Sequence, residues 1–184
     1  MKNVILLMHV SLDGFVAGPN GEMDFIQFDE GMFALVDTLH PLADTALYGR
    51  NTFNMMESYW PTADESPNAT VHTKNHAQWY RESQKLVVST TLKSDNPKTK
   101  IITPEQMQQE KQQPGKDILM IGSPTSVHAF LDAGLIDEFW LFVNPVLLGA
   151  GIPLFKNVQQ QVNLKLVESK PFDIGVIALH YKKA

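Results

Sequence analysis

The chain has 184 residues, enough for one domain that buries roughly 70% of the surface of its unfolded state. Its formal net charge of −5 argues against a nucleic-acid-binding face, although a phosphorylated small ligand needs only one or two local cations. There are no cysteines, which excludes disulfides, thiol chemistry and a cysteine-ligated metal. We therefore expect a single domain over residues 1–184, with no nucleic-acid partner and no bound metal.

The amino-terminal segment is apolar, and its pattern predicts a buried strand at residues 4–10. His9 and Ser11 interrupt the apolar run and no small-residue cleavage site follows, so a secretion signal is not indicated. No other segment approaches the roughly 20 apolar residues of a transmembrane helix. We therefore expect a cytoplasmic protein with no membrane partner.

Predicted strands and helices alternate through most of the chain. After a glycine-punctuated loop at 13–21, Asp29 can cap a helix whose apolar residues recur at helical spacing as far as Leu39. The remaining predicted elements are a strand at 45–48, a helix at 51–58, a polar surface excursion at 60–84 with one short helix around 73–81, a strand at 86–89, a glutamine-rich helix at 104–113, a strand at 117–121, a helix from the turn at 122–126 to residue 133, a strand at 138–143 and a hairpin of strands at 164–169 and 174–181. This order predicts an α/β fold with a mostly parallel central sheet, flanking helices and a C-terminal antiparallel hairpin.

Three of the predicted strands end in a glycine-containing or hydroxyl-rich turn, at residues 49–52, 89–91 and 122–126. In open α/β sheets ligands bind outside the carboxyl ends of the strands, where helix N-termini offer unpaired amides to anions. Gly49 allows close backbone approach and Arg50 supplies a forked cation. One such turn is usually only a turn, whereas three on one sheet edge are equally consistent with a dinucleotide site.

The stretch 135–155 joins an apolar strand to a loop shaped by Pro145, Gly149, Gly151 and Pro153. This run resembles the signature of the dihydrofolate-reductase-like superfamily, and most closely the reductase domain at the C-terminal end of the bifunctional riboflavin-biosynthesis protein. The resemblance covers most of the chain apart from the excursion at 60–84. It implies a dihydrofolate-reductase-like fold with NADPH as cofactor. This superfamily binds NADPH without the tandem-glycine fingerprint of Rossmann folds.

Several motifs carry this resemblance into a cofactor site. The tetrapeptide at 49–52 is similar to the family's Gly-Arg-x-Thr motif, in which the arginine faces the 2′-phosphate of NADPH and the threonine a pyrophosphate oxygen. The turn at 122–126 stands where the family has a Gly-Gly turn with a cis peptide, so we expect Gly122–Ser123 to be cis although serine replaces the second glycine. The cofactor-binding residues implied are Val16, Ala17, Gly49, Arg50, Asn51, Thr52, Ser89, Thr90, Gly122, Ser123, Pro124, Thr125 and Ser126.

The catalytic carboxylate is less clearly defined. The resemblance makes Asp29 the nearest counterpart of the folate-reductase acid, but Asp24 and Glu30 compete with it, and the residues themselves favour an N-cap as the explanation of Asp29. Asp13 is a second catalytic candidate that could be only a turn residue. Phe33 is expected to cover the substrate face and Trp60 to line a flat substrate.

The histidines have ordinary structural explanations in the sequence. His72 and His76 have the four-residue spacing of helical metal ligands, but no third ligand is evident, so a solvated helix face is predicted. His9 is predicted to be a packed core histidine.

The sequence therefore predicts an NADPH-dependent reductase that transfers a hydride to a pterin, an aminopyrimidine or a related small polar molecule. The alternatives are a true dihydrofolate reductase and a nucleotide-binding regulatory or scaffold protein that keeps the fold without catalysis. We expect a homodimer, because the resembled branch is commonly dimeric and the terminal hairpin carries large apolar side chains.

Overall fold

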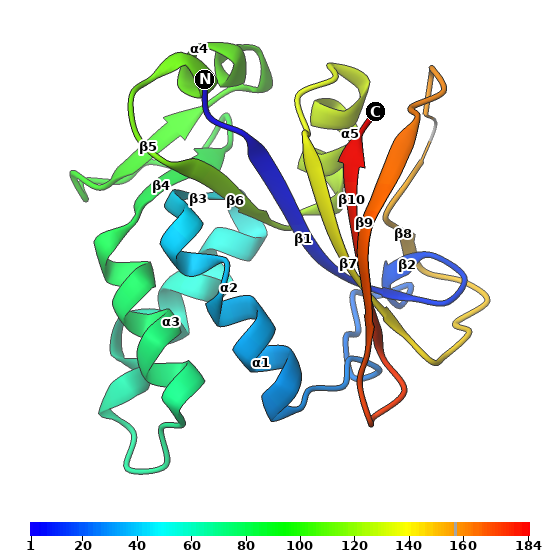
Figure 1. The fold of residues 1–184 in the computed structure, drawn as a ribbon. Coiled ribbons are helices and arrows are strands. Elements are labelled where there is room, and N and C mark those ends of the chain that lie inside the picture. Colours follow the sequence, from blue (N-terminus) through cyan, green and yellow to red (C-terminus); the bar gives the residue numbers. More distant parts are fainter. Residues whose placement is uncertain (157) are drawn as a thin grey trace.

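The computed structural model describes residues 1–156 and 158–184. It contains an eight-stranded sheet with the strand order β5-β4-β3-β6-β1-β7-β10-β9 (Figure 1). The strands are β1 (Val4–Ser11), β3 (Ala43–Gly49), β4 (Gln84–Val88), β5 (Thr99–Ile102), β6 (Asp117–Ile121), β7 (Glu138–Asn144), β9 (Leu164–Pro171) and β10 (Ile177–Lys183). The six strands from β5 to β7 run parallel, and β10 and β9 add an antiparallel pair. The predicted parallel sheet with a terminal hairpin is confirmed.

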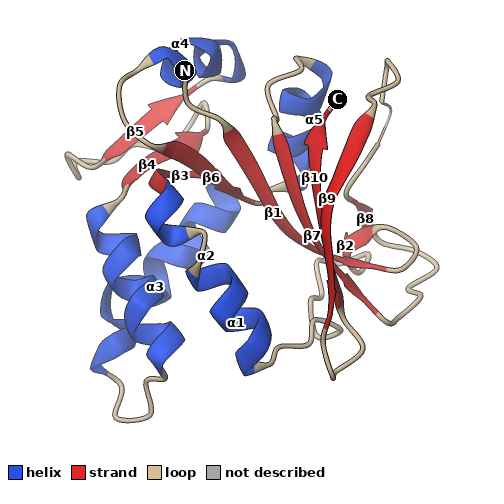
Figure 2. Cartoon of the chain, in the orientation of Figure 1, coloured by secondary structure: helices blue, strands red, loops and turns tan. Residues whose placement is uncertain are grey.

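Helices cover both faces of the sheet (Figure 2). Successive residues of β1 point to opposite faces, so that Leu6 joins one core cluster and Ile5 the other. The Ile5 face is covered by α1 (Glu30–Asp37), α2 (Arg50–Tyr59) and α3 (Val71–Glu82). The Leu6 face is covered by α4 (Met107–Gln112) and α5 (Pro124–Asp132). Both faces of the central strands are therefore buried, which explains their continuous apolar runs.

The carboxyl ends of the parallel strands share one edge of the sheet, and the loops that follow them meet there. A second, two-stranded sheet pairs β2 (Phe15–Ala17) with β8 (Ile152–Pro153). This pairing joins the loop after β1 to the loop after β7. The turns that the sequence singles out at residues 49–52, 89–91 and 122–126 all lie along the same edge.

The excursion at 60–84 differs most from expectation. It consists of a 3-10 segment, η2 (Trp60–Glu65), and the 12-residue helix α3, which Thr70 caps by accepting from the amide of Thr73. One face of α3 is buried, with Ala77 and Tyr80 inside the core. The helix predicted around 73–81 is confirmed as α3, but the predicted surface position of this segment is wrong, because the polar residues of the outer face obscure a buried stripe at helical spacing.

Several short strands and 3-10 segments were not predicted from the sequence. Strand β5 has only four residues, and β2 and β8 have three and two, too few to show a periodic pattern. Two further 3-10 segments, η1 (His40–Leu42) and η3 (Pro104–Gln106), lie next to α1 and α4. Strand β10 begins at Ile177, three residues later than predicted. Among the residues described, no helix combines the length and apolar character that crossing a membrane requires.

Candidate functional site

The turns after β3 and β6 interlock through two glycines. A Cβ atom on Gly49 would lie 2.2 Å from Oγ of Ser123, and one on Gly122 would lie 2.9 Å from Oγ1 of Thr52. The hydroxyl of Ser126 lies 3.4 Å from that of Ser123. Backbone and three hydroxyl groups therefore come together at this point of the sheet edge, at a density that only glycine permits.

Both turns lead directly into helices, α2 and α5. Neither N-cap, Gly49 or Ser123, makes a side-chain capping bond, and Pro124 occupies the first turn of α5. The Gly122–Ser123 peptide is cis, which confirms the expectation for this turn. Thr125 is exposed, and Thr52 is half-buried beside Gly122. Two helix N-termini with amides that no side chain caps favour a negatively charged group here.

Arg50 forms a corner with the turn that follows β4. The exposed guanidinium donates from Nη1 to Oγ1 of Thr91 over 2.8 Å. The hydroxyl of Ser89 orders this turn by accepting from the amides of Thr91 (3.2 Å) and Leu92 (3.0 Å). Thr90 is exposed between them, as is Asn51 beside Arg50. Thr91 lies in the hydroxyl-rich turn that the sequence singled out, but it was not among the implied cofactor-binding residues.

The backbone of Val16 and Ala17 is fixed by the loop after β7. Both residues are buried in β2, and the amide of Leu154 donates to the carbonyl of Gly14 over 2.9 Å. A Cβ on Gly151 would lie 2.2 Å from the carbonyl oxygen of Ala17. The glycine-rich stretch of the second loop is thus needed so that the two backbones can touch.

Asp13 ties the same two loops together. Its carboxylate accepts from the hydroxyl of Ser11 (2.6 Å) and from the amides of Leu148 (3.1 Å) and Gly149 (2.8 Å). These hydrogen bonds, that of Ser11 first, lower the pKa of Asp13. Asp13 is therefore an ionised acceptor that holds the loops, and this geometry does not make it a proton donor.

Asp29 is the N-cap of α1. Its Oδ1 accepts from the amide of Met32 over 2.7 Å, and its backbone is extended. The N-cap explanation from the sequence is confirmed, and the two competing carboxylates, Asp24 and Glu30, are exposed. The described residues of this region hold no carboxylate that the geometry marks as a proton donor.

Aromatic rings from four segments form a continuous row of ring contacts, which we call the aromatic wall: Phe28, Phe33, His72 and Trp60. Phe33 lies parallel to Phe28 at 5.5 Å and to His72 at 4.4 Å between ring centroids. Trp60 meets the edge of His72 at 6.2 Å. Phe28 remains 55% exposed and so offers an apolar surface. The two residues predicted to line the substrate therefore share a neighbour, His72, that was not predicted.

His9 on β1 continues the stack towards the carboxyl edge. It stacks on Phe142 at 4.9 Å and meets Phe28 edge-on at 5.1 Å, as a packed histidine should. Burial lowers the pKa of His9 to about 4, so the ring is neutral near pH 7. Its Nδ1 is buried without a hydrogen-bond partner.

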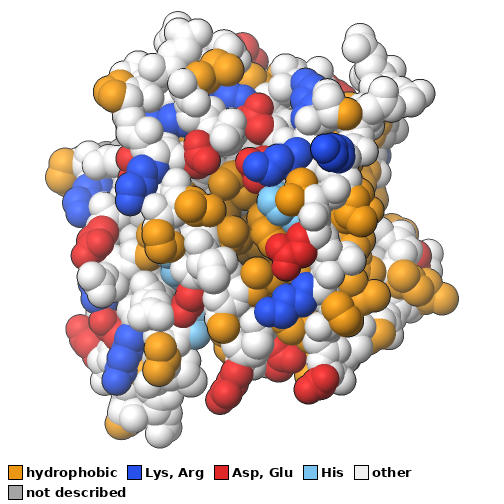
Figure 3. Space-filling model, in the orientation of Figure 1, with side chains coloured by type: hydrophobic (Ala, Val, Ile, Leu, Met, Phe, Trp, Pro, Cys, Tyr) orange, Lys and Arg blue, Asp and Glu red, His pale blue; other side chains and the backbone are white. Residues whose placement is uncertain are grey.

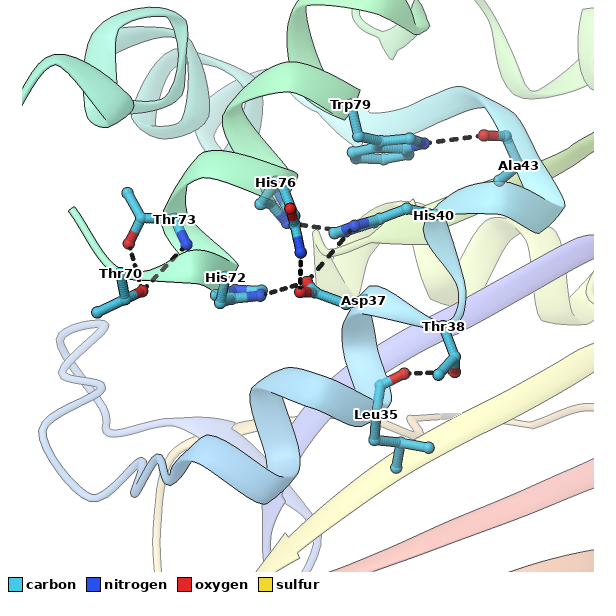
Figure 4. Close-up of polar contacts among 11 residues, drawn as sticks. Leu35, Asp37, Thr38, His40, Ala43, Thr70, His72, Thr73, His76 and Trp79 are labelled. Carbon is cyan, nitrogen blue, oxygen red and sulfur yellow. Dashed lines mark hydrogen bonds and ion pairs between the residues drawn. The ribbon is translucent and has the colours of Figure 1, made fainter.

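Three histidines and one aspartate form a second polar cluster, between α1, η1 and α3 (Figure 4). Asp37 Oδ1 lies 2.5 Å from Nδ1 of His72 and 3.6 Å from Nδ1 of His40. Nε2 of His40 lies 3.1 Å from Nδ1 of His76, which is buried. The predicted solvated helix face is therefore wrong, because the histidine pair of α3 faces α1 and η1. In the described part of the chain, no group of three or more His, Asp or Glu side chains could hold a metal ion.

Comparison with known proteins places this geometry in a family. Residues 2–178 match the RibD C-terminal domain. Protein YyaP of Bacillus subtilis (strain 168) is 36% identical over 186 residues, which cover 98% of this chain and 94% of that protein. A pyrimidine reductase-like protein from Corynebacterium diphtheriae superposes with a TM-score of 0.65 at 16% identity, covering 100% of this chain and 92% of that one.

A two-activity enzyme shows the same fold in one part of its chain. The diaminohydroxyphosphoribosylaminopyrimidine deaminase/5-amino-6-(5-phosphoribosylamino)uracil reductase of Thermotoga maritima superposes with a TM-score of 0.66 at 14% identity, covering 100% of this chain and 57% of that one. At such identities these structures establish the fold, which is dihydrofolate-reductase-like, as expected. The match over residues 2–178 goes further: the chain belongs to the family of RibD C-terminal domains, the reductase-type domains of riboflavin biosynthesis.

Proposed function

We propose that this protein is an NADPH-dependent reductase that transfers a hydride to a pterin, an aminopyrimidine or a related small polar heterocycle. The observation that carries the proposal is the convergence, at one sheet edge, of the interlocked turns at Gly49 and Gly122, the Arg50 corner and the buried backbone of Val16 and Ala17. Membership of a family of reductase-type domains supports the same reaction class.

The residues at this edge fit the parts of a phosphorylated dinucleotide. The N-termini of α2 and α5, with the hydroxyls of Thr52, Ser123 and Ser126, suit a pyrophosphate. Arg50 is exposed at the corner beside Thr91, where a bidentate cation suits a 2′-phosphate. The tightly held backbone of Val16 and Ala17 would contact the nicotinamide carboxamide. The bound cofactor would supply the hydride, and the chain would orient it and exclude water.

The substrate class follows from the aromatic wall. Phe28 is 55% exposed and presents an apolar ring surface next to His9, whose imidazole is neutral and has an unpaired Nδ1, and Phe33 stacks on Phe28. Such a surface suits a flat heterocycle with hydrogen-bonding edges. The names of two structural neighbours, a pyrimidine reductase-like protein and a 5-amino-6-(5-phosphoribosylamino)uracil reductase, support this choice.

The test is absorbance loss of reduced nicotinamide over a panel of pterins, aminopyrimidines, imines and dihydrofolate, preceded by titration with NADPH. Turnover of a pterin or pyrimidine supports the proposal, and turnover of dihydrofolate alone assigns the protein as a true dihydrofolate reductase. Tight NADPH binding without turnover of any panel member would favour the regulatory or scaffold alternative. A protein that binds neither NADPH nor NADH is not a reductase of this kind.

We propose further that the protein is a homodimer. Every residue of the edge strand β9 is exposed, including Leu164, Leu166 and Val167, and Ile177 of β10 is exposed beside them. A hollow of about 500 Å³ lies between these strands and α1 (Figure 3). It is at the amino-terminal end of the parallel strands, opposite the strand-end turns. Apolar side chains line it, and charged side chains of both signs lie at its rim. A second copy of this chain would cover this apolar surface. Light scattering that shows only monomer at micromolar concentration would contradict this.

A further inference from the structure

The stretch that leads up to Arg50 carries charge of one sign. From residue 3 to residue 49 the sequence contains no lysine or arginine. Its histidines, His9 and His40, are neutral near pH 7, because burial lowers the pKa of each to about 4. Its acidic residues are Asp13, Glu22, Asp24, Asp29, Glu30, Asp37 and Asp44. At neutral pH the charged side chains of this stretch are therefore all negative.

Phe28, the exposed ring of the aromatic wall, lies within this stretch. Its ring meets His9 of β1 edge-on, and the amide of the residue before it donates to the buried side chain of Asn144, at the end of β7, over 3.0 Å. Asp29 and Glu30 follow Phe28 directly in the chain. The ring surface that is proposed to face the substrate is therefore flanked in the chain by two carboxyl groups.

Two more carboxylates of this stretch are held in the ionised form by hydrogen-bond donors. The hydroxyl of Ser11 and two backbone amides lower the pKa of Asp13. In the connection from β2 to α1, Glu22 accepts from the side chain of Asn20 over 2.7 Å and from its amide over 2.9 Å, and these bonds lower the pKa of Glu22 as well. All of these donors are uncharged, so they leave both negative charges in place.

One lysine from another segment approaches the start of α1. Nζ of Lys170, on β9, lies 5.4 Å from the ring centroid of Phe172, and a Cβ on Gly31 would lie 3.5 Å from that ring. A single exposed lysine does not offset several carboxylates. The proposed cofactor side is different, because Arg50 and the uncapped N-termini of α2 and α5 supply a forked cation and free amides there.

We propose that the substrate of this protein carries no phosphate group, and that the charge of the substrate side selects an uncharged or cationic flat heterocycle. This rests on the proposed function, because it takes Phe28 and His9 to face the substrate. A phosphate monoester has close to two negative charges at neutral pH, and like charges brought together at a binding surface weaken binding. The Thermotoga maritima neighbour, in contrast, is named for a substrate with a phosphoribosyl group.

The test compares three forms of one ligand: an alcohol, its phosphate monoester and the dimethyl ester of that phosphate. They are made for a ribosylated aminopyrimidine and for a pterin with a hydroxylated side chain. With NADPH as reductant, kcat/KM of the alcohol should exceed that of the monoester at least about tenfold. The dimethyl ester has the bulk of a phosphate without its charge, so it should react within about threefold of the alcohol. Raising the salt from about 0.05 M to about 0.5 M should narrow the difference, because salt screens charges.

The outcomes separate this proposal from the proposed function. A monoester that reacts faster than its alcohol would overturn the proposal and leave hydride transfer intact. A dimethyl ester as poor as the monoester would also overturn it, because size and not charge would then exclude the phosphate. If nothing is reduced, the proposed function fails, and calorimetric titration of the same ligands into the full chain decides instead. The alcohol must then bind, and the monoester must bind at least about tenfold more weakly; any other result overturns the proposal.

A charge reversal in the chain tests where the selectivity comes from. Glu30→Lys, at an exposed position in the first turn of α1, should narrow the preference for the alcohol about fivefold. Asp132→Lys is the matched control: it makes the same change in net charge at the exposed last residue of α5, on the other face of the sheet, and should leave the preference within about twofold. Should Glu30→Lys not fold, Glu30→Gln serves instead and should narrow the preference about twofold. Equal effects at the two positions would show that the net charge of the whole protein sets the preference, which would overturn a role of the substrate side.

Discussion

The two sides of the candidate site are built differently. The proposed cofactor side is made of backbone and short side chains at strand ends, where Gly49 and Gly122 let two turns interlock. The proposed substrate side is made of large rings on α1, η2 and α3 that meet only after those elements pack together. Contacts of the first kind are encoded in short sequence motifs, whereas contacts of the second kind depend on tertiary structure. Each side can therefore be disrupted without destroying the other.

The largest effect is expected from Gly49→Ala. The new Cβ would lie 2.2 Å from Oγ and 2.9 Å from Cβ of Ser123, so the turns must separate. We expect a loss of about 3 kcal/mol in the free energy of unfolding, the upper part of the usual range for overpacking, and a matching loss of NADPH binding. Denaturant titration and calorimetry measure the two quantities.

A second substitution tests whether the clash with Ser123 causes this loss of stability. Adding Ser123→Gly removes both clashing atoms, so the double variant should recover most of the stability. A double variant as unstable as Gly49→Ala would show that the interlock is not the reason for a glycine at this position. The aromatic wall should be intact throughout, as judged by the ring signals of Phe33.

The next effect concerns Arg50→Ala. A charge-assisted contact to a 2′-phosphate should be lost, at a cost of about 1.5–3 kcal/mol or roughly tenfold to a hundredfold in NADPH affinity. NADH has no such phosphate and should bind the variant as it binds the parent. Parallel titrations with both cofactors measure this. Equal losses would mean that Arg50 supports the turn through Thr91 instead.

The same contrast explains how much the sequence could predict. The sheet, the strand-end turns and the cis peptide at Gly122 follow from local motifs and a family resemblance, and all are confirmed. Thr91 was missed because nothing local separates it from Thr90; only the position of Arg50 in space selects it.

The contacts of the histidine cluster could not be predicted from the sequence, because they join residues that are far apart in the chain. Asp37 and His40 lie some 35 residues from His72 and His76, and a spacing of four on α3 says only that the pair shares a face. Whether that face meets water or α1 depends on how the excursion packs. The polar composition of residues 60–84 suggested that this face of α3 meets water, whereas in the structure it packs against α1.

A smaller effect concerns His9, whose ring meets Phe28 of the aromatic wall. Its pKa is about 4 in the folded protein and 6.5 in the unfolded chain, so below pH 6.5 the unfolded state takes up the proton first. The contribution of neutral His9 to the free energy of unfolding should therefore be fully present above pH 6.5 and should be lost as the pH drops towards 4. His9→Phe, which can keep the stacking on Phe142, should remove about 1–2 kcal/mol of the loss between pH 6.5 and pH 5.

The measurement is denaturant unfolding of both proteins at several pH values. His40 and His76 also have lowered pKa values, so the variant should keep a reduced slope and not become flat. An unchanged slope would show that His9 is accessible to protons in the folded state.

The smallest effect separates two explanations of Asp29 at the start of α1. As an N-cap it accepts from the amide of Met32, and asparagine offers an equivalent oxygen. Asp29→Ala should therefore cost about 1 kcal/mol of stability, and Asp29→Asn much less. If Asp29 only caps α1, turnover by Asp29→Asn should equal that of the parent at every pH. A loss of kcat in this variant, with its stability retained, would show that the carboxyl group takes part in the reaction and that the site has an acid after all.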